Sequence, residues 1–146
     1  MGKVVSLLLC IFFLVCCSSL EIKKENYPSD QERKELEYIL KHLDYGRPYK
    51  EGVFDCSNQS ALLYDFLSAR DYKCKIIVGF EQLIGGVRHA WVVAEKNGKI
   101  FIIEPVYKCL VTTNRYKGYT LQIEFDSLEN LRSFCSFFGF ENEWKY

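Results

Sequence analysis

Proline is scarce in this chain, and neither sign of charge is in excess. The 146 residues include three prolines, and 19 basic side chains balance 19 acidic ones. Collagen-like and disordered chains are excluded, because they are rich in proline or poor in apolar residues, whereas 49% of this chain is apolar. The zero net charge also removes the general electrostatic footprint of a nucleic-acid-binding protein. The length allows one domain and hardly two.

The N-terminal apolar run is too short for a typical transmembrane helix, which needs about 20 residues. It covers Val4 to Cys17, follows the basic Lys3 and precedes the small pair Ser18-Ser19. This pattern is typical of a secretory signal. Its end, with Cys16 and Cys17, also resembles a lipoprotein signal, in which a cysteine is lipidated after cleavage. We therefore expect residues 1–19 to be a cleaved signal, a lipoprotein signal or an uncleaved anchor, and the protein to be secreted or anchored to a membrane outside the cytoplasm.

Residues 20–28 are predicted to be a polar tether, and residues 29–146 to be one folded domain. Ser29 and Glu32 form a capping-box pattern at the start of a helix. Apolar residues follow at helical spacing, namely Leu36, Ile39, Leu40 and Leu43. The pattern predicts a helix from about Asp30 to Asp44.

A second helix is predicted to start at Asp55 or Cys56. Its expected buried face consists of Ala61, Leu62, Phe66 and Ala69. A third, short helix is predicted to open at a second capping-box pattern, Asp126 to Glu129, and Gly139 can stop it.

The strands are predicted between these last two helices. Lys75–Phe80 is rich in β-branched residues, and Tyr119–Phe125 alternates between apolar and polar residues. Two further β-prone runs flank Asn97-Gly98, which is a strong signal for a hairpin. Two leading helices followed by hairpin-linked strands favour an α+β fold over a parallel doubly wound sheet.

Histidine is so scarce that a cysteine–histidine catalyst must use His42 or His89. His42 lies on the charged first helix and is interpreted as an ordinary helix-surface residue. His89 lies in the predicted hairpin, whose turn sets its position opposite Val106 and diagonal to Glu104 on the same face. Diagonal Cα atoms are about 7–8 Å apart, within reach of long side chains. A carboxylate there would fix the imidazole tautomer and stabilise the imidazolium.

Cys56 is the candidate nucleophile. Its expected place on the first turn of the second helix favours a thiolate, because unpaired N–H groups and the helix dipole lie there. The same N–H groups can bind an oxyanion, and a nearby histidine can activate the thiol. The residues alone leave open whether Cys56 and His89 meet, and a buried structural cysteine is the alternative interpretation.

Three segments resemble the core motifs of transglutaminase-like cysteine proteins: Phe54-Asp55-Cys56-Ser57-Asn58, Arg88-His89-Ala90-Trp91-Val92 and Ile103-Glu104-Pro105. Their order and their spacings of 33 and 15 residues are similar too, and the resemblance covers about Tyr49 to Tyr107. It implies a papain-like α+β core, with the nucleophile helix packed on a small antiparallel sheet.

The resemblance also implies roles for three residues. Cys56 would be the nucleophile, His89 the general base and acid, and Glu104 the orienting carboxylate. The family usually has aspartate at the last position, where this chain has glutamate. The chain has no clear equivalent of the family's oxyanion-hole side chain, and Tyr49, which precedes Cys56, is the only candidate named for that part. No cofactor and no metal is expected for this chemistry.

Two classes of function follow, with a third possibility behind them. The leading prediction is an exported, membrane-tethered thiol enzyme that acts on amide bonds of proteins or peptides by hydrolysis or acyl transfer. The alternative is a catalytically inactive binding module at the cell surface that uses the same cleft. The third interpretation makes Cys56, His89 and Glu104 zinc ligands with one open position.

Two weaker signals remain. Cys74, Cys109 and Cys135 are too scattered for a C-x-x-C zinc site. An exported chain permits one disulfide among them, and buried small hydrophobes are the alternative interpretation. Asn58-Gln59-Ser60 matches a glycosylation sequon, but its place on the nucleophile helix indicates coincidence.

Overall fold

The computed structural model describes residues 22–51, 53–81, 85–112 and 119–137. Along the chain its elements are η1 (Lys24–Asn26), α2 (Asp30–Lys41), α3 (Cys56–Ser68), β1 (Lys73–Glu81), β2 (Val87–Lys96), β3 (Lys99–Glu104), β4 (Cys109–Leu110), β5 (Tyr119–Phe125) and α5 (Leu128–Phe137). The predicted α+β class is confirmed. The predicted signal at residues 1–19 lies outside the described residues, and within them no helix is both long and apolar enough to cross a membrane.

The five strands form one antiparallel sheet in the order β4-β3-β2-β1-β5. The predicted hairpin is confirmed, since Lys96 pairs with Lys99 across the turn. Asn97 and Gly98 both have positive φ values, 52° and 73°, as a tight two-residue hairpin turn requires. The two-residue strand β4 was not predicted, because so short a segment carries no periodicity.

The predicted capping box of α2 is confirmed, because Ser29 Oγ accepts from Glu32 N at 3.3 Å while Glu32 Oε2 accepts from Ser29 N at 2.7 Å. The predicted helix end at Asp44 was wrong. The helix ends at Lys41. The backbone N–H of the C-cap residue His42 donates to the carbonyls of Ile39 and Leu40. Leu43 still packs against the core, so its apolar character reflects burial outside the helix.

The buried face of α3 differs from the predicted one. Leu63 and Leu67 are fully buried, whereas Leu62 is half-buried and Ala69 is exposed. The polar residues of the first turn are buried too, which hides the simple amphipathic pattern. At α5 the cap is Ser127 rather than the predicted Asp126, since Ser127 Oγ accepts from Asn130 N at 3.2 Å.

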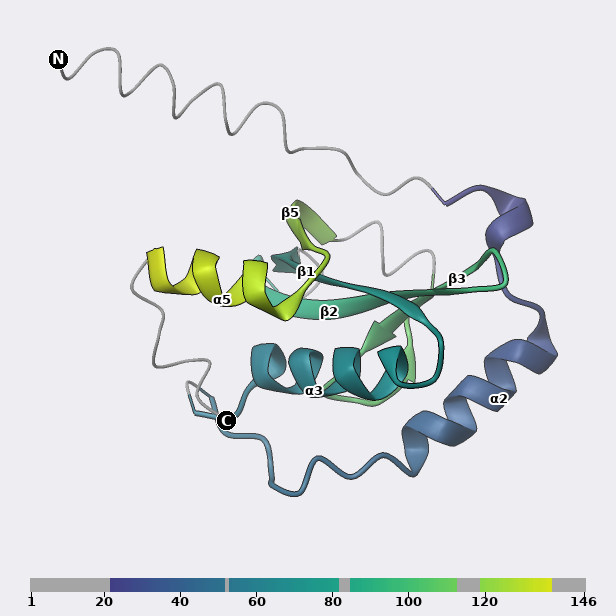
Figure 1. Ribbon diagram of the computed structural model, residues 1–146, viewed down its shortest axis with the longest axis horizontal. Coiled ribbons are helices and arrows are strands. Elements are labelled where there is room, and N and C mark those ends of the chain that lie inside the picture. Colours follow the sequence, from purple (N-terminus) through teal and green to yellow (C-terminus); the bar gives the residue numbers. More distant parts are fainter. Residues whose placement is uncertain (1–21, 52, 82–84, 113–118, 138–146) are drawn as a thin grey trace, which may run out of the picture.

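All three α-helices contribute to one hydrophobic core on one face of the sheet. Figure 1 shows α2 and α3 on the same side of the strands. Their buried side chains pack with those of α5 and the strands; they include Leu36, Leu40, Ala61, Leu63, Leu67, Ile76, Val92, Ile103 and Leu131. The core therefore fixes α3, and with it Cys56, relative to β2 and β3.

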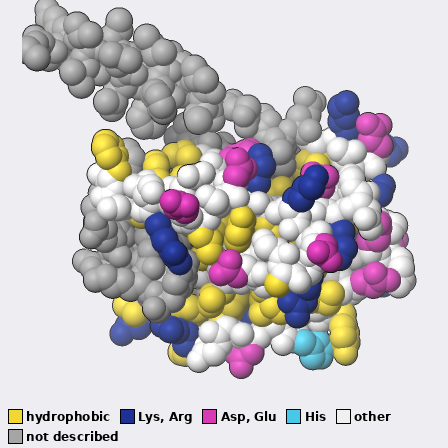
Figure 2. Space-filling model, viewed as in Figure 1, with side chains coloured by type: hydrophobic (Ala, Val, Ile, Leu, Met, Phe, Trp, Pro, Cys, Tyr) yellow, Lys and Arg dark blue, Asp and Glu magenta, His cyan; other side chains and the backbone are white. Residues whose placement is uncertain are grey.

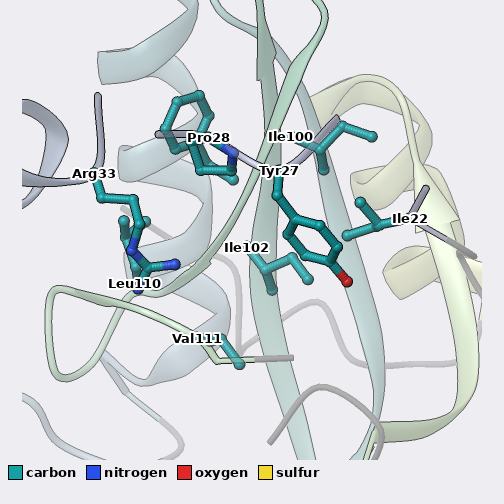
Figure 3. A pocket seen from close by; sticks show the side chains of 9 residues that line it. Ile22, Tyr27, Pro28, Arg33, Ile100, Ile102, Leu110 and Val111 are labelled. Carbon is teal, nitrogen blue, oxygen red and sulfur yellow. The ribbon is translucent and has the colours of Figure 1, made fainter. Parts of the chain in front are cut away.

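A second cluster occupies the other sheet face and consists of Ile77, Trp91, Val93, Ile102 and Val111. Ile22 packs against it, and Lys99 Nζ donates to Glu25 O at 2.8 Å. Figure 3 shows the Ile22 and Tyr27 side chains beside Ile100 and Ile102. Residues 22–28, within the predicted tether, are thus packed on β3.

The charged side chains are mixed on the face seen in Figure 2, where basic and acidic groups alternate around small apolar areas. This distribution accords with the equal numbers of acidic and basic residues in the sequence.

Candidate active site

Cys56 is the first residue of α3, and its neighbours determine where the helix begins. The N-cap residue Asp55 accepts through Oδ1 from Ser57 N at 3.0 Å and from Ser57 Oγ at 2.7 Å. Asn58 Oδ1 accepts in return from Asp55 N at 3.0 Å. All three capping residues are buried, whereas Cys56 is partly exposed. The thiol therefore lies at the positive end of the helix dipole, within reach of solvent.

The segment before Cys56 folds back on itself. Lys50 and Phe54 form an antiparallel bridge, with N···O distances of 2.8 and 2.7 Å. This bridge brings Tyr49 alongside Asp55. Burial raises the pKa of the Tyr49 phenol, and the charge of Cys56 raises it further, so the phenol lies near the thiol.

His89 and Glu104 meet on one face of the hairpin, as the turn register predicted. His89 Nε2 lies 2.6 Å from Glu104 Oε2. The Glu104 side chain is fully buried, and the exposed fraction of the His89 side chain is 12%. The second carboxylate oxygen, Oε1, accepts from Val106 N at 3.0 Å. Both oxygens of Glu104 therefore have donors, which keeps the buried carboxylate in one orientation.

The electrostatics of His89 depend on both of its partners. Burial lowers the pKa of His89, but hydrogen bonding to Cys56 and Glu104 and the charges of both outweigh burial and raise that pKa to about 10. Since Glu104 occupies Nε2, Nδ1 is the ring nitrogen left for the thiol. The imidazole is therefore protonated at neutral pH and lies between two acidic groups.

No protein-family model matches this chain, and no curated protein matches its sequence. The resemblance to transglutaminase-like proteins therefore rests on the three sequence motifs.

Trp91 packs directly on the histidine. Its ring is stacked with the His89 ring, with 6.1 Å between centroids and 25° between planes. The Trp91 side chain is fully buried and belongs to the second hydrophobic cluster. It is thus both a core aromatic and a wall of the site.

Tyr45 also reaches this site, although no pattern in the sequence indicated it. Its phenol OH donates to Pro105 O at 2.9 Å. Burial raises the pKa of Tyr45, and the charge of the nearby Glu104 raises it further. The contact joins residues 60 positions apart in the chain and belongs to no motif, so no spacing argument could have found it.

The remaining candidates lie elsewhere. His42 is exposed at the end of α2, where its Nδ1 contacts Tyr38 O at 2.8 Å. No disulfide joins Cys74, Cys109 and Cys135 to one another or to another described cysteine. Cys74 and Cys135 are buried, and burial raises the pKa of Cys74 to about 11.

Asn58 is fully buried and bonded to the helix cap, which makes the sequon inaccessible in the folded protein.

The zinc interpretation finds no support among the described residues. No group of three His, Cys, Asp or Glu side chains within them has the arrangement of a metal site. His89 lies between the Cys56 thiol and Glu104, so these three side chains form a chain of contacts instead of converging on one point.

The pocket drawn in Figure 3 is a separate feature, under residues 22–28. Its volume is about 20 Å³, enough for roughly one water molecule. This pocket cannot hold a peptide or any other organic substrate.

Proposed function

We propose that the protein is a thiol enzyme of transglutaminase-like type that acts on amide bonds of proteins or peptides. The observation that carries this proposal is the contact chain from Cys56 through His89 to the buried Glu104. The proposal includes a papain-like core, because the thiol begins a helix packed on an antiparallel sheet whose adjacent strands carry the histidine and the acid. It also includes export and a membrane anchor, for which the pattern of residues 1–19 is the support.

The first half of the reaction uses the thiolate and the imidazolium. The Cys56 thiolate attacks the amide carbonyl, so a C–S bond forms and the carbonyl electron pair moves to oxygen. The first N–H groups of α3, with the Tyr49 phenol beside them, stabilise that oxyanion. The intermediate then collapses, the C–N bond breaks, and His89 gives its proton to the departing amine. A thioester on Cys56 remains.

The second half resolves this thioester. Water or a second amine attacks the carbonyl carbon and gives its proton to His89. The C–S bond breaks, and the thiolate–imidazolium pair is restored. Hydrolysis and acyl transfer therefore differ only in the nucleophile that enters. Throughout both halves Glu104 keeps its position and stabilises the positive imidazolium.

The surroundings of the thiol suit a polypeptide substrate. Tyr49 precedes Cys56 in the sequence and is 49% exposed. Tyr107 follows Glu104 and is 71% exposed. Exposed aromatic rings offer apolar area with a polar tip, which is the usual character of peptide-binding surfaces.

The test is formation and release of an acyl-enzyme. The full chain is incubated with a short peptide carrying an activated C-terminal ester, quenched in acid and weighed by mass spectrometry, before and after hydroxylamine is added. We expect the acyl mass on Cys56 and its release as a peptide hydroxamate. The variant Cys56→Ser should acquire no acyl group, and Cys109→Ser should behave as wild type. A folded wild-type protein without acylation at Cys56 would overturn the proposal and favour the binding-module alternative.

A further inference from the structure

Tyr45 connects the two halves of the candidate active site. It lies in the segment between α2 and α3, and its side chain is partly buried. The phenol OH donates to Pro105 O, directly after the candidate acid Glu104. The ring packs edge-on against Phe54, two residues before Cys56, with centroids 6.3 Å apart and planes at 67°.

This contact lies in the turn that follows β3. Proline has no N–H, so the carbonyl of Pro105 is its only backbone group that can form a hydrogen bond. Tyr45 uses that carbonyl, while Glu104 Oε1 accepts from Val106 N within the same turn. Two hydrogen bonds thus hold the backbone next to Glu104. Tyr45 binds the carbonyl of Pro105, and the carboxylate of Glu104 itself binds the N–H of Val106.

A second contact joins the same two segments. Lys108 Nζ donates to Leu43 O, and the ammonium group lies 5.0 Å from the centroid of the Tyr45 ring. Two hydrogen bonds therefore join the turn after β3 to the α2–α3 connection: one links Pro105 to Tyr45, and the other links Lys108 to Leu43. Because burial and the charge of Glu104 raise the pKa of Tyr45, the phenol stays protonated and remains a donor.

We propose that Tyr45 is a positioning residue of the active site, which holds the Glu104 turn against the segment that leads into Cys56. Through Glu104 it sets the place of the His89 ring relative to the thiol. This inference rests on the proposed function, because it assigns Tyr45 a part in the same site.

Tyr64 provides a matched control. Its phenol OH donates to Asp126 O at 2.8 Å, in the turn that joins β5 to α5. Each tyrosine thus ties one distant turn through one phenol–carbonyl bond, but only Tyr45 is coupled to the charge of Glu104. The variants Tyr45→Phe and Tyr64→Phe each remove one hydroxyl and keep the ring.

The experiment measures alkylation of Cys56 by iodoacetamide against pH in the full chain. The titratable groups that face His89 are Cys56 from α3 and Glu104 from β3, with Tyr49 beside the thiol and Tyr45 beside the carboxylate. For Tyr45→Phe we expect alkylation at about pH 6 to slow about two- to tenfold, the factor that corresponds to one neutral hydrogen bond. Tyr64→Phe should lower the Tm by a similar amount and leave the alkylation profile unchanged.

A second readout is the NMR titration of the imidazole, which does not depend on thiol reactivity. The chain has two histidines, so a His42→Asn variant assigns the spectrum. The midpoint of His89 should move down in Tyr45→Phe and stay in place in Tyr64→Phe. An unchanged His89 midpoint in Tyr45→Phe would overturn the inference. A different result would separate the two proposals. If Cys56 of the wild type is alkylated slowly while the His89 midpoint still moves in Tyr45→Phe, the proposed function is contradicted and the positioning role stands.

Discussion

The carboxylate of Glu104 has no solvent-exposed surface and lies 2.6 Å from the imidazole of His89. A buried charge is costly unless it is paired and hydrogen-bonded. Burial lowers the pKa of His89, but hydrogen bonding to Cys56 and to Glu104, together with the charges of both, raises it to about 10. The contact with Glu104 is therefore one of the two contacts that keep the imidazole of His89 protonated at neutral pH.

Selective alkylation of Cys56 is the first expected outcome. It is partly exposed at a helix start and interacts with the imidazolium, whereas Cys74 is buried with its pKa raised to about 11. Under limiting iodoacetamide near neutral pH, peptide mass spectrometry should find the label on Cys56 first. Equal labelling of Cys109, which is also partly exposed, would remove the argument for an activated nucleophile.

Substitution of the acid should affect turnover more than folding. In Glu104→Gln the imidazolium loses its counter-charge, and we expect turnover to fall about 10²–10⁴-fold, with the loss known for a Ser–His–Asp triad as the upper limit. Gln has one carbonyl oxygen for the two donors that Glu104 now accepts from, so the free energy of unfolding should fall by about 1–3 kcal/mol.

The control for this substitution is Ile102→Ala, which removes a buried side chain from the same strand and should cost about 2–5 kcal/mol of stability. Acylation is compared well below both melting temperatures. Acylation of Glu104→Gln at the wild-type rate would show that the carboxylate does not orient a catalytic base, even with a reactive Cys56.

The stability of the protein should depend on the charge of His89. Its folded-state pKa of about 10 lies above the ordinary 6.5, so the stabilisation is fully present below about pH 6.5 and is lost as the pH rises through about 10. The effect should be on the order of a few kcal/mol, since each pKa unit corresponds to about 1.4 kcal/mol.

Urea unfolding of wild type and His89→Asn across this pH range checks the prediction. The variant should show a smaller loss of stability towards high pH. The exposed residue His42 supplies the matched control, because His42→Asn should keep the wild-type dependence. If His89→Asn loses as much stability as wild type, the histidine is not the group that titrates.

Removal of the N-cap of α3 should slow the alkylation of the Cys56 thiol, whereas removal of the N-cap of α2 should leave it unchanged. Asp55→Ala and Ser29→Ala each remove an N-cap and should each cost about 0.5–2 kcal/mol. Only Asp55→Ala disturbs the turn that carries Cys56, so only this variant should slow its alkylation. Equal alkylation rates in the two variants would mean that the helix start does not activate the thiol.

Removal of residues 1–19 should leave a folded domain, since the first capping box begins well after them. Removal of residues 1–28 should be less tolerated, because Ile22 and Tyr27 would no longer cover Ile100 and Ile102. We expect the longer deletion to lower the free energy of unfolding by about 1–3 kcal/mol, judged from the apolar area uncovered. Chemical denaturation of the two shortened chains measures this difference.

Local and hairpin features of this protein could be predicted from the sequence. The Asn97-Gly98 turn specified the pairing of β2 with β3, and the period of two along a strand then placed His89 and Glu104 on one face. The Ser29 capping box predicted the start of α2. These inferences succeeded because the interacting groups are neighbours in sequence or are related by a single tight turn.

The contacts that complete the candidate site were decided only by tertiary structure. Cys56 meets His89 because the core packs α3 against the sheet, and no periodicity measures that distance. The buried face of α3 was misjudged for a related reason, since tertiary packing buries even the polar residues of its first turn. Tyr45 reaches Pro105 across 60 residues of chain, and this contact depends on where two separate loops come together. Sequence thus determined the elements and the chemistry they carry, whereas long-range packing determined which side chains meet.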